Sequence, residues 1–134
     1  MAHAPARAGY AWHTAMIHDW ARSSATELAA RLRRREVSAT QLLQANLDRV
    51  AKLNPALNAV VVHDAERAMR RAHEADAALA RGELWGPLHG VPITVKESFD
   101  LPGLPTSWGI RDFRDNIAAR PAVVQRARHH LLAG

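Results

Sequence analysis

The sequence contains no cysteine and no long apolar run, and each absence removes a class of protein. Without cysteine the chain has no disulfide, no thiolate metal site and no cysteine nucleophile. No apolar run approaches the roughly 20 residues that a membrane-spanning helix needs. The stretch before Ala21 carries histidines and aromatic residues where a signal peptide needs an unbroken apolar core. We therefore expect a cytoplasmic protein with no membrane partner.

What is present suits one ordinary domain. The chain has 134 residues, and its apolar content of 48% is enough for a core. The formal net charge of +5 predicts only non-specific attraction to anions. The basic run Arg33–Arg35 is typical of a solvated helix end, and it contains no aromatic side chain that could stack on a base. The sequence therefore predicts no nucleic-acid partner.

Three helices are predicted between residues 24 and 82. Ser24 with Glu27, and Ser38 with Gln41, have the spacing of capping boxes that begin the first two helices. We expect Asn54-Pro55 to end the second helix, Asp64 to begin the third and Gly82 to end it. The positions expected to face inward are Leu28, Leu32, Leu42, Leu43, Ala45, Leu47, Val50, Ala65, Ala68, Met69, Ala72, Ala75 and Leu79.

Two strands are predicted, at Leu57–Val62 and Gly90–Lys96, so the expected fold class is α/β. A further helix is predicted after Pro121, with Val123, Val124, Ala127 and Leu131 on one face. Residues 1–20 are expected to be a disordered leader, and translation from Met1 or from Met16 stays open. Residues 21–134 form the remaining unit.

The stretch "GPLHGVPITVKESFD", Gly86–Asp100, is the candidate site. Between Gly86 and Gly109 the chain has four prolines and four glycines around one short apolar run. Loops of fixed geometry are where functional side chains are commonly placed. Lys96 ends the apolar run "VPITV". A lysine in that position is expected to be buried, and a buried lysine needs a chemical purpose.

Residues 24–109 resemble the N-terminal part of the amidase signature family, which are serine amide hydrolases. The resemblance rests on "GPLHGVPITVKESFDLPGLPTSWG", together with the capped helix, "NPALNAV" and the Ala-rich helix in the family's order. It implies an α/β fold, namely the N-terminal part of a mixed sheet covered by helices, truncated before the catalytic serines. It also implies a small-molecule amide as substrate, once the missing segment is supplied.

In that family the lysine that matches Lys96 belongs to a Ser–Ser–Lys triad, whose middle serine follows a cis peptide bond. The resemblance thus implies that Lys96 is catalytic. A lysine in water has a pKa of ~10.4, so it is protonated at neutral pH and cannot act as a base. Burial penalises the charged form, and a neutral amine can then activate a hydroxyl. The implied site requires no cofactor and no metal.

The neighbouring polar residues have simpler interpretations. His89 is expected to pack the loop, because the family's triad uses no histidine. Ser98 and Ser107 lie outside the glycine- and serine-rich stretch in which the family places its serines, so neither is the predicted nucleophile. Glu97 replaces the aspartate that usually follows the lysine, which keeps the charge and lengthens the side chain. His129 and His130 are adjacent, a poor spacing for metal binding on a helix.

Three functions stay open for the sequence. The first is an amide hydrolase present as an N-terminal fragment, with the triad lysine but without the serine nucleophile. The second is a non-catalytic remnant or a partner-binding module. The third is an A-type amidotransferase subunit that acts on misacylated tRNA. Whether the chain is a natural truncation, a frame-shift product or a partial sequence also stays open. We expect the isolated chain to be inactive and prone to self-association.

Overall fold

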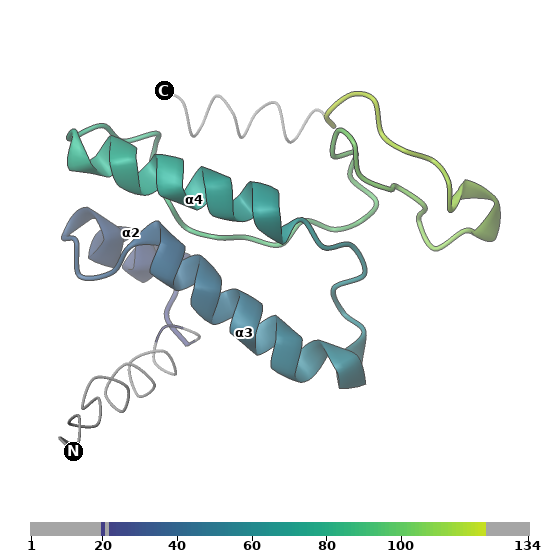
Figure 1. Ribbon diagram of the computed structural model, residues 1–134, viewed down its shortest axis with the longest axis horizontal. Coiled ribbons are helices and arrows are strands. Elements are labelled where there is room, and N and C mark those ends of the chain that lie inside the picture. Colours follow the sequence, from purple (N-terminus) through teal and green to yellow (C-terminus); the bar gives the residue numbers. More distant parts are fainter. Residues whose placement is uncertain (1–19, 21, 123–134) are drawn as a thin grey trace, which may run out of the picture.

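The computed structural model describes residues 20 and 22–122, which contain three α-helices. They are α2 (Ala25–Arg33), α3 (Ala39–Leu57) and α4 (Ala65–Ala80), followed by a short 3-10 helix, η1 (Arg111–Phe113). Figure 1 shows α3 and α4 side by side, with α2 at the end of the pair where α3 begins. The expected leader and the helix expected after Pro121 lie outside the described residues.

The two predicted serine caps are present. The Ser24 hydroxyl accepts a hydrogen bond from the Glu27 N–H at 3.2 Å and begins α2. At α3 the capping box is reciprocal, because Ser38 Oγ accepts from Gln41 N–H while Gln41 Oε1 accepts from Ser38 N–H, each at 3.0 Å. Asp64 occupies the N-cap of α4, but its side chain makes no capping bond and pairs with Arg67 instead. Asp64 therefore begins α4, as expected, but does not cap the helix through its side chain.

The end of α4 lies where the sequence places it. The N–H of Gly82 donates to Leu79 and that of Glu83 donates to Ala78, which is the Schellman pattern around a glycine at φ +82°. The end of α3 lies later than expected. The helix continues through Pro55 to Leu57 and ends at Asn58, which is left-handed at φ 48°. Because Pro55 stands in the last turn, its missing N–H removes only one bond near the helix end.

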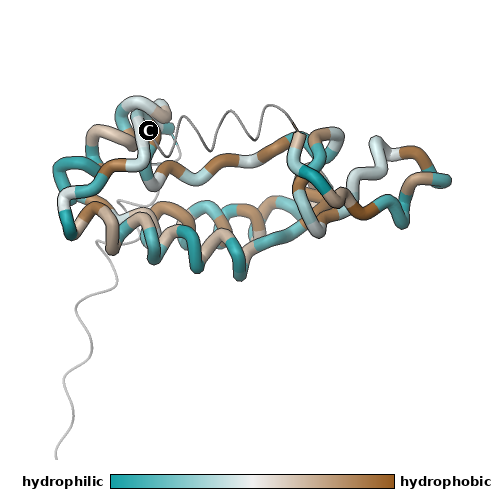
Figure 2. Tube along the Cα trace, turned by 90° about the horizontal axis from the view of Figure 1, so that it is seen from above, coloured by the Kyte–Doolittle hydropathy of each residue, from teal (hydrophilic) through white to brown (hydrophobic). Residues whose placement is uncertain are grey.

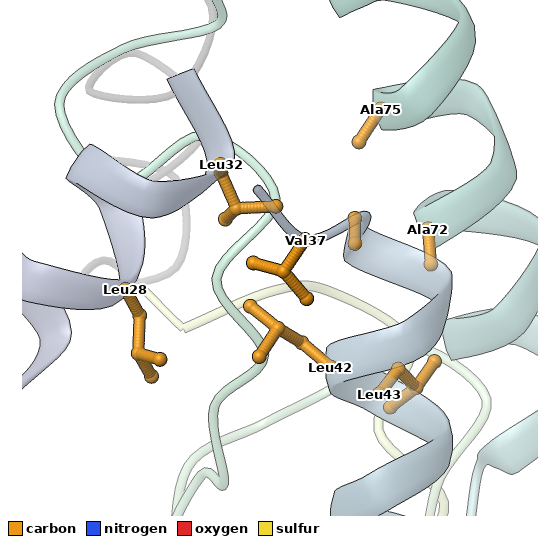
Figure 3. Packing of buried hydrophobic residues seen from close by; sticks show 8 residues of the cluster. Leu28, Leu32, Val37, Leu42, Leu43, Ala72 and Ala75 are labelled. Atoms are coloured by element: carbon orange, nitrogen blue, oxygen red, sulfur yellow. The ribbon is translucent and has the colours of Figure 1, made fainter. Parts of the chain in front are cut away.

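The hydrophobic core lies where α2, α3 and α4 meet (Figure 3). Leu32 and Leu42 are almost fully buried there, at 1% and 0% exposure. Alanines on α4 allow the helix to approach closely, and the fully buried Ala78 joins the expected Ala72 and Ala75. Ala65, expected to face inward, is exposed. The core therefore occupies only the end of the helix pair at which α3 begins.

The two predicted strands do not form within residues 22–122. Leu57 is the last residue of α3, and residues 58–62 and 91–96 have no strand pairing. The single bridge in the described part of the chain joins Pro105 to Ile117. Figure 2 shows an extended, partly apolar stretch running along the helices. A strand exists only when a neighbouring strand accepts and donates its backbone hydrogen bonds, and these segments have no such neighbour here.

Among the described helices, none combines the length and the apolar composition that a bilayer crossing requires.

Candidate active site

The loop that precedes the candidate lysine is held by its own backbone hydrogen bonds and by a bond from α2. The N–H of His89 donates to Gly86 at 3.2 Å, and the N–H of Val91 donates to Leu88 at 3.1 Å. From α2, the Arg33 guanidinium donates to the Pro87 carbonyl at 2.6 Å. These bonds give residues 86–91 a compact turn instead of an open connection.

His89, a residue of this loop, is buried at 3% exposure. Its Nδ1 accepts the Trp85 N–H at 3.1 Å, and its Nε2 lies 3.0 Å from the Ala75 carbonyl on α4. Because Nδ1 accepts from a backbone N–H, Nε2 carries the proton and donates to that carbonyl. The ring also packs edge-on against Trp85, over which the Arg71 guanidinium lies at 3.7 Å. His89 packs the loop, as the sequence predicts.

After Gly90 the chain is extended and leads to Lys96. A cavity of about 670 Å³ separates this segment from α4, and apolar side chains such as Ala68, Ala72, Trp85, Val91 and Val95 line it. Asp64, Arg67 and Arg71 also line it. The segment is thus held at Gly90 and is only loosely covered farther on.

Lys96 itself is exposed. Its backbone carbonyl accepts the Phe99 N–H at 3.0 Å, so the chain turns immediately after it. No hydrogen bond or ion pair joins its ammonium group to another side chain within residues 22–122. The dry surroundings expected for a basic lysine are therefore not supplied by the described residues.

Glu97 is the best-connected polar side chain of the segment. Its carboxylate accepts the N–H of Ser107 through one oxygen and the N–H of Trp108, at 2.9 Å, through the other. The Ser107 N–H is the main cause that lowers the pKa of Glu97 below its ordinary value; the Ser107 hydroxyl and the Trp108 N–H add to it, against partial desolvation. In the sequence, Glu97 was noted only because it replaces the aspartate that usually follows the lysine. Its contact with Ser107 and Trp108 was not predicted.

The loop that Glu97 holds, residues 103–118, is a small hairpin. Gly103 and Ala118 are joined by a backbone bond, as are Ala118 and Leu104, and Thr106 and Asn116. The Asn116 side chain also donates to the Thr106 carbonyl. Figure 1 shows this hairpin projecting beyond the helices. Its base is tied to α4 through a bond from Arg67 to the Pro102 carbonyl.

The two candidate serines of the segment do not engage the lysine. Ser107 Oγ accepts the N–H of Gly109 at 3.2 Å and belongs to the turn of the hairpin. No hydrogen bond between Ser98 and Lys96 exists in the described part of the chain. Likewise, residues 22–122 contain no cluster of three or more side chains suited to a metal ion. His129 and His130 lie outside the described residues.

Two contacts of the basic run Arg33–Arg35 were missed by sequence reasoning. Besides Arg33, the guanidinium of Arg35 donates to the Leu79 carbonyl at the end of α4, at 3.1 Å. Two of the three arginines in the basic run therefore bind backbone carbonyls of distant segments, and the run is more than a solvated helix end. Composition alone gives no signal for such contacts, since they depend on how the helices pack.

The comparison with family models decides the family. The model described as Amidase matches residues 41–129, which include α3 from its third residue, all of α4 and the whole site segment. The chain belongs to the amidase family.

Individual amidases and related enzymes match at similar levels. An acylamidase from Rhodococcus erythropolis is 43% identical over 101 residues, covering 75% of this chain and 21% of that protein. An indoleacetamide hydrolase from Bradyrhizobium diazoefficiens is 45% identical over 103 residues, covering 77% and 20%. The A-type subunit of a glutamyl-tRNA(Gln) amidotransferase from Acidothermus cellulolyticus is 43% identical over 113 residues, covering 84% and 22%.

A solved structure agrees with the family's fold. A bacterial aryl acylamidase of the amidase signature family superposes with a TM-score of 0.68 at 29% identity. The match covers 72% of this chain and 20% of that one. The expected family fold is thus confirmed, with the two strand segments left unpaired. The chain spans about a fifth of the length of the curated relatives it matches.

Proposed function

We propose that this amidase chain supplies the general base, Lys96, of an amide hydrolase acting on small-molecule amides. The observation that carries the proposal is the amidase family match across the lysine segment, in which Lys96 ends an extended stretch fixed at Gly90 and at Glu97. The two serines of the triad, and the amides that would stabilise the oxyanion, are expected on a segment that these 134 residues do not contain.

The chemistry requires more than the described residues provide. A protonated, exposed lysine cannot take a proton from a serine hydroxyl at neutral pH. The proposal therefore requires that the remaining segment covers Lys96 and brings the middle serine within reach, because burial penalises the charged form of an amine. The exposed position of Lys96 in this structure leaves its ammonium group free for such a contact.

A second function has a specific observation in its favour. A-type subunits of glutamyl-tRNA(Gln) amidotransferases recur among the relatives, and the one from Acidothermus cellulolyticus covers 84% of this chain. The same lysine would then serve an amidotransferase, whose assay is release of ammonia from glutamine in the presence of misacylated tRNA. A protein that hydrolyses simple aryl and alkyl amides without tRNA is an amidase of the first kind.

The test compares the chain with a version extended through the serine segment of one of these relatives. We expect the extended protein to hydrolyse some members of a panel of aryl and alkyl amides. Lys96→Ala should lower the rate by roughly 10²- to 10⁴-fold or more, the contribution of a general base. Lys96→Arg should be nearly as damaging, because a guanidinium stays protonated at working pH.

The sequence offers a matched control. Lys52, the other lysine of the chain, is exposed on α3, and Lys52→Arg should leave the rate unchanged. A Lys96→Arg variant with a near-normal rate would remove the general-base assignment. An extended protein inactive on every amide and on glutamine would favour a non-catalytic, partner-binding role.

A further inference from the structure

We propose that Glu97 is a positioning residue, which fixes the backbone at Lys96 by locking the adjoining segment onto the turn of the 103–118 hairpin. The proposal rests on the proposed function only in naming Lys96 as the residue that is positioned. The contact itself stands on the geometry of two peptide N–H groups and one carboxylate.

The acceptor geometry is bidentate. The two carboxylate oxygens of Glu97 bind two consecutive N–H groups, those of Ser107 and Trp108, ten and eleven residues away along the chain. Trp108 and Gly109 both have positive φ, at 58° and 72°, so the turn presents its N–H groups toward one acceptor. A charged acceptor bound to two donors is stronger than a neutral one and restricts both partners.

The hairpin that receives Glu97 is itself anchored. Its two arms are cross-linked by backbone bonds, and its base is held to α4 by the bond from Arg67 to Pro102. Thr106, just before the turn, is 2% exposed. A side chain bound to an anchored hairpin has a fixed position relative to α4, whereas one bound to a free loop does not.

Lys96 lies between two fixed points because of this lock. On one side, Gly90 lies so near Ala39 and Leu32 that the space beside it would not hold an added Cβ without a shift. On the other side, the turn closed by the bond from Phe99 to Lys96 includes Glu97, so the carboxylate restrains the residue directly after the lysine. The intervening residues 92–95 have no strand partner. Without the Glu97 contact, the next bond that ties the chain to a helix after the lysine would be the one from Arg67 to the Pro102 carbonyl, six residues farther on.

Substitution of the carboxylate tests this lock in the chain as it exists. Glutamine keeps the length of the side chain but has one acceptor oxygen, and its amide nitrogen would face the second N–H. In Glu97→Gln we expect hydrogen exchange at the Ser107 and Trp108 amides to accelerate about tenfold or more. We also expect the ¹⁵N order parameter of Lys96 to fall, and Glu97→Asp to restore part of both signals.

Amide exchange within α3 and α4 reports whether the variant has lost the whole fold. The matched control is Glu83→Gln, which removes the same charge from an exposed pair with Arg81 and should leave the hairpin amides unchanged. Unchanged exchange at both Ser107 and Trp108 in a folded Glu97→Gln variant would overturn the proposal. So would an unchanged order parameter at Lys96.

Titration of the native chain gives a second test that needs no variant. The other charged residues of its segment and of the hairpin are Lys96, Asp100, Arg111, Asp112, Arg114 and Asp115. None of them forms an ion pair with Glu97 in the described residues, and no charged group contributes to the shift of its pKa. Because the pKa of Glu97 is lowered in the folded chain, the lock is present above the ordinary carboxylate pKa and is lost as the pH falls through the lowered value.

The amide shifts of Ser107 and Trp108 should therefore follow one titration below the ordinary carboxylate range. Shifts that do not move with a carboxylate in that range would overturn the proposal. Neither test measures turnover, so the two proposals fail separately. If the Glu97 contact is found but the extended protein keeps its rate after Lys96→Ala, the proposed function is wrong and the positioning role of Glu97 at this backbone stands.

Discussion

At the scale of single residues, Gly90 has tighter surroundings than Gly82, Gly103 and Gly109. Its φ is +73°, a region that costs a residue with a side chain about 1–2 kcal/mol. A Cβ built on it would lie 3.1 Å from the Cβ of Ala39 and 3.4 Å from Leu32, both in the core. Gly90 therefore combines a conformational and a steric requirement.

Gly90→Ala should lower the free energy of unfolding by about 2–4 kcal/mol, since overpacking adds to the cost of positive φ. Gly103 is the matched control, with φ +79° and nothing within 4 Å of the added Cβ. Gly103→Ala should cost only about 1–2 kcal/mol. Urea unfolding of both variants measures the difference, and equal costs would mean that the backbone at Gly90 shifts to accept the methyl group.

That Lys96 is catalytic stays a prediction from its motif, and the motif does not predict what surrounds the lysine. Lys96 was identified from its motif, and the packing role of His89 is confirmed by its two hydrogen bonds. The contact between Glu97 and the hairpin could not be predicted, because it joins segments whose approach depends on the turn at Trp108. A tryptophan at positive φ gives little sequence signal, whereas the glycine after it does.

At the scale of helices, the start of α3 is held by a residue of α4. Asp76 accepts the N–H groups of Ala39 and Thr40, at 2.7 and 3.1 Å, and the Thr40 hydroxyl at 2.8 Å. These amides are among the unpaired donors of a helix N-terminus, where a carboxylate also opposes the positive end of the helix dipole. The helix pair is therefore joined by charge and hydrogen bonding at the same end as the core.

Asp76→Ala should lower the free energy of unfolding by about 1–3 kcal/mol, because buried donors lose a charged acceptor. Glu74→Ala is the control on the same helix: its carboxylate makes only an exposed pair with Arg71. That change should stay within about 0.5 kcal/mol. Thermal unfolding of both variants checks this, and an Asp76 variant as stable as the Glu74 variant would show that water replaces the carboxylate.

Helices were easier to predict than strands for a physical reason. The backbone hydrogen bonds of a helix lie within its own segment. The serine caps and the apolar spacing were therefore enough to predict where α2 and α3 begin. A strand needs a neighbour, and the β-branched runs at residues 58–62 and 91–95 show only that such a neighbour would suit them. The end of α3 was predicted too early. The helix ends at the left-handed Asn58, whereas Asn54-Pro55 was expected to end it.

At the scale of the whole molecule, the described chain leaves much apolar surface uncovered. Beyond the core, large apolar side chains remain from about two-fifths to two-thirds exposed; they are Leu53, Leu57, Val61, Leu84, Leu88, Ile93, Phe99, Trp108, Ile110, Phe113 and Ile117. Several of them belong to the hairpin and to the extended segment that leads to the lysine. Exposed apolar surface of this extent favours association.

We predict that the chain of 134 residues is marginally folded, associates in solution and hydrolyses no amide. Amide cleavage requires a nucleophile within reach of the base and donors for the oxyanion, and in the described residues no serine hydroxyl is bound to Lys96. Sedimentation should show oligomers that decrease when Phe113→Ser and Ile117→Thr remove exposed apolar area from the hairpin. A monodisperse monomer with a cooperative thermal transition would contradict the expected association. Turnover of any amide that disappears in Lys96→Ala would contradict the expected inactivity, because a serine within this chain would then be the nucleophile.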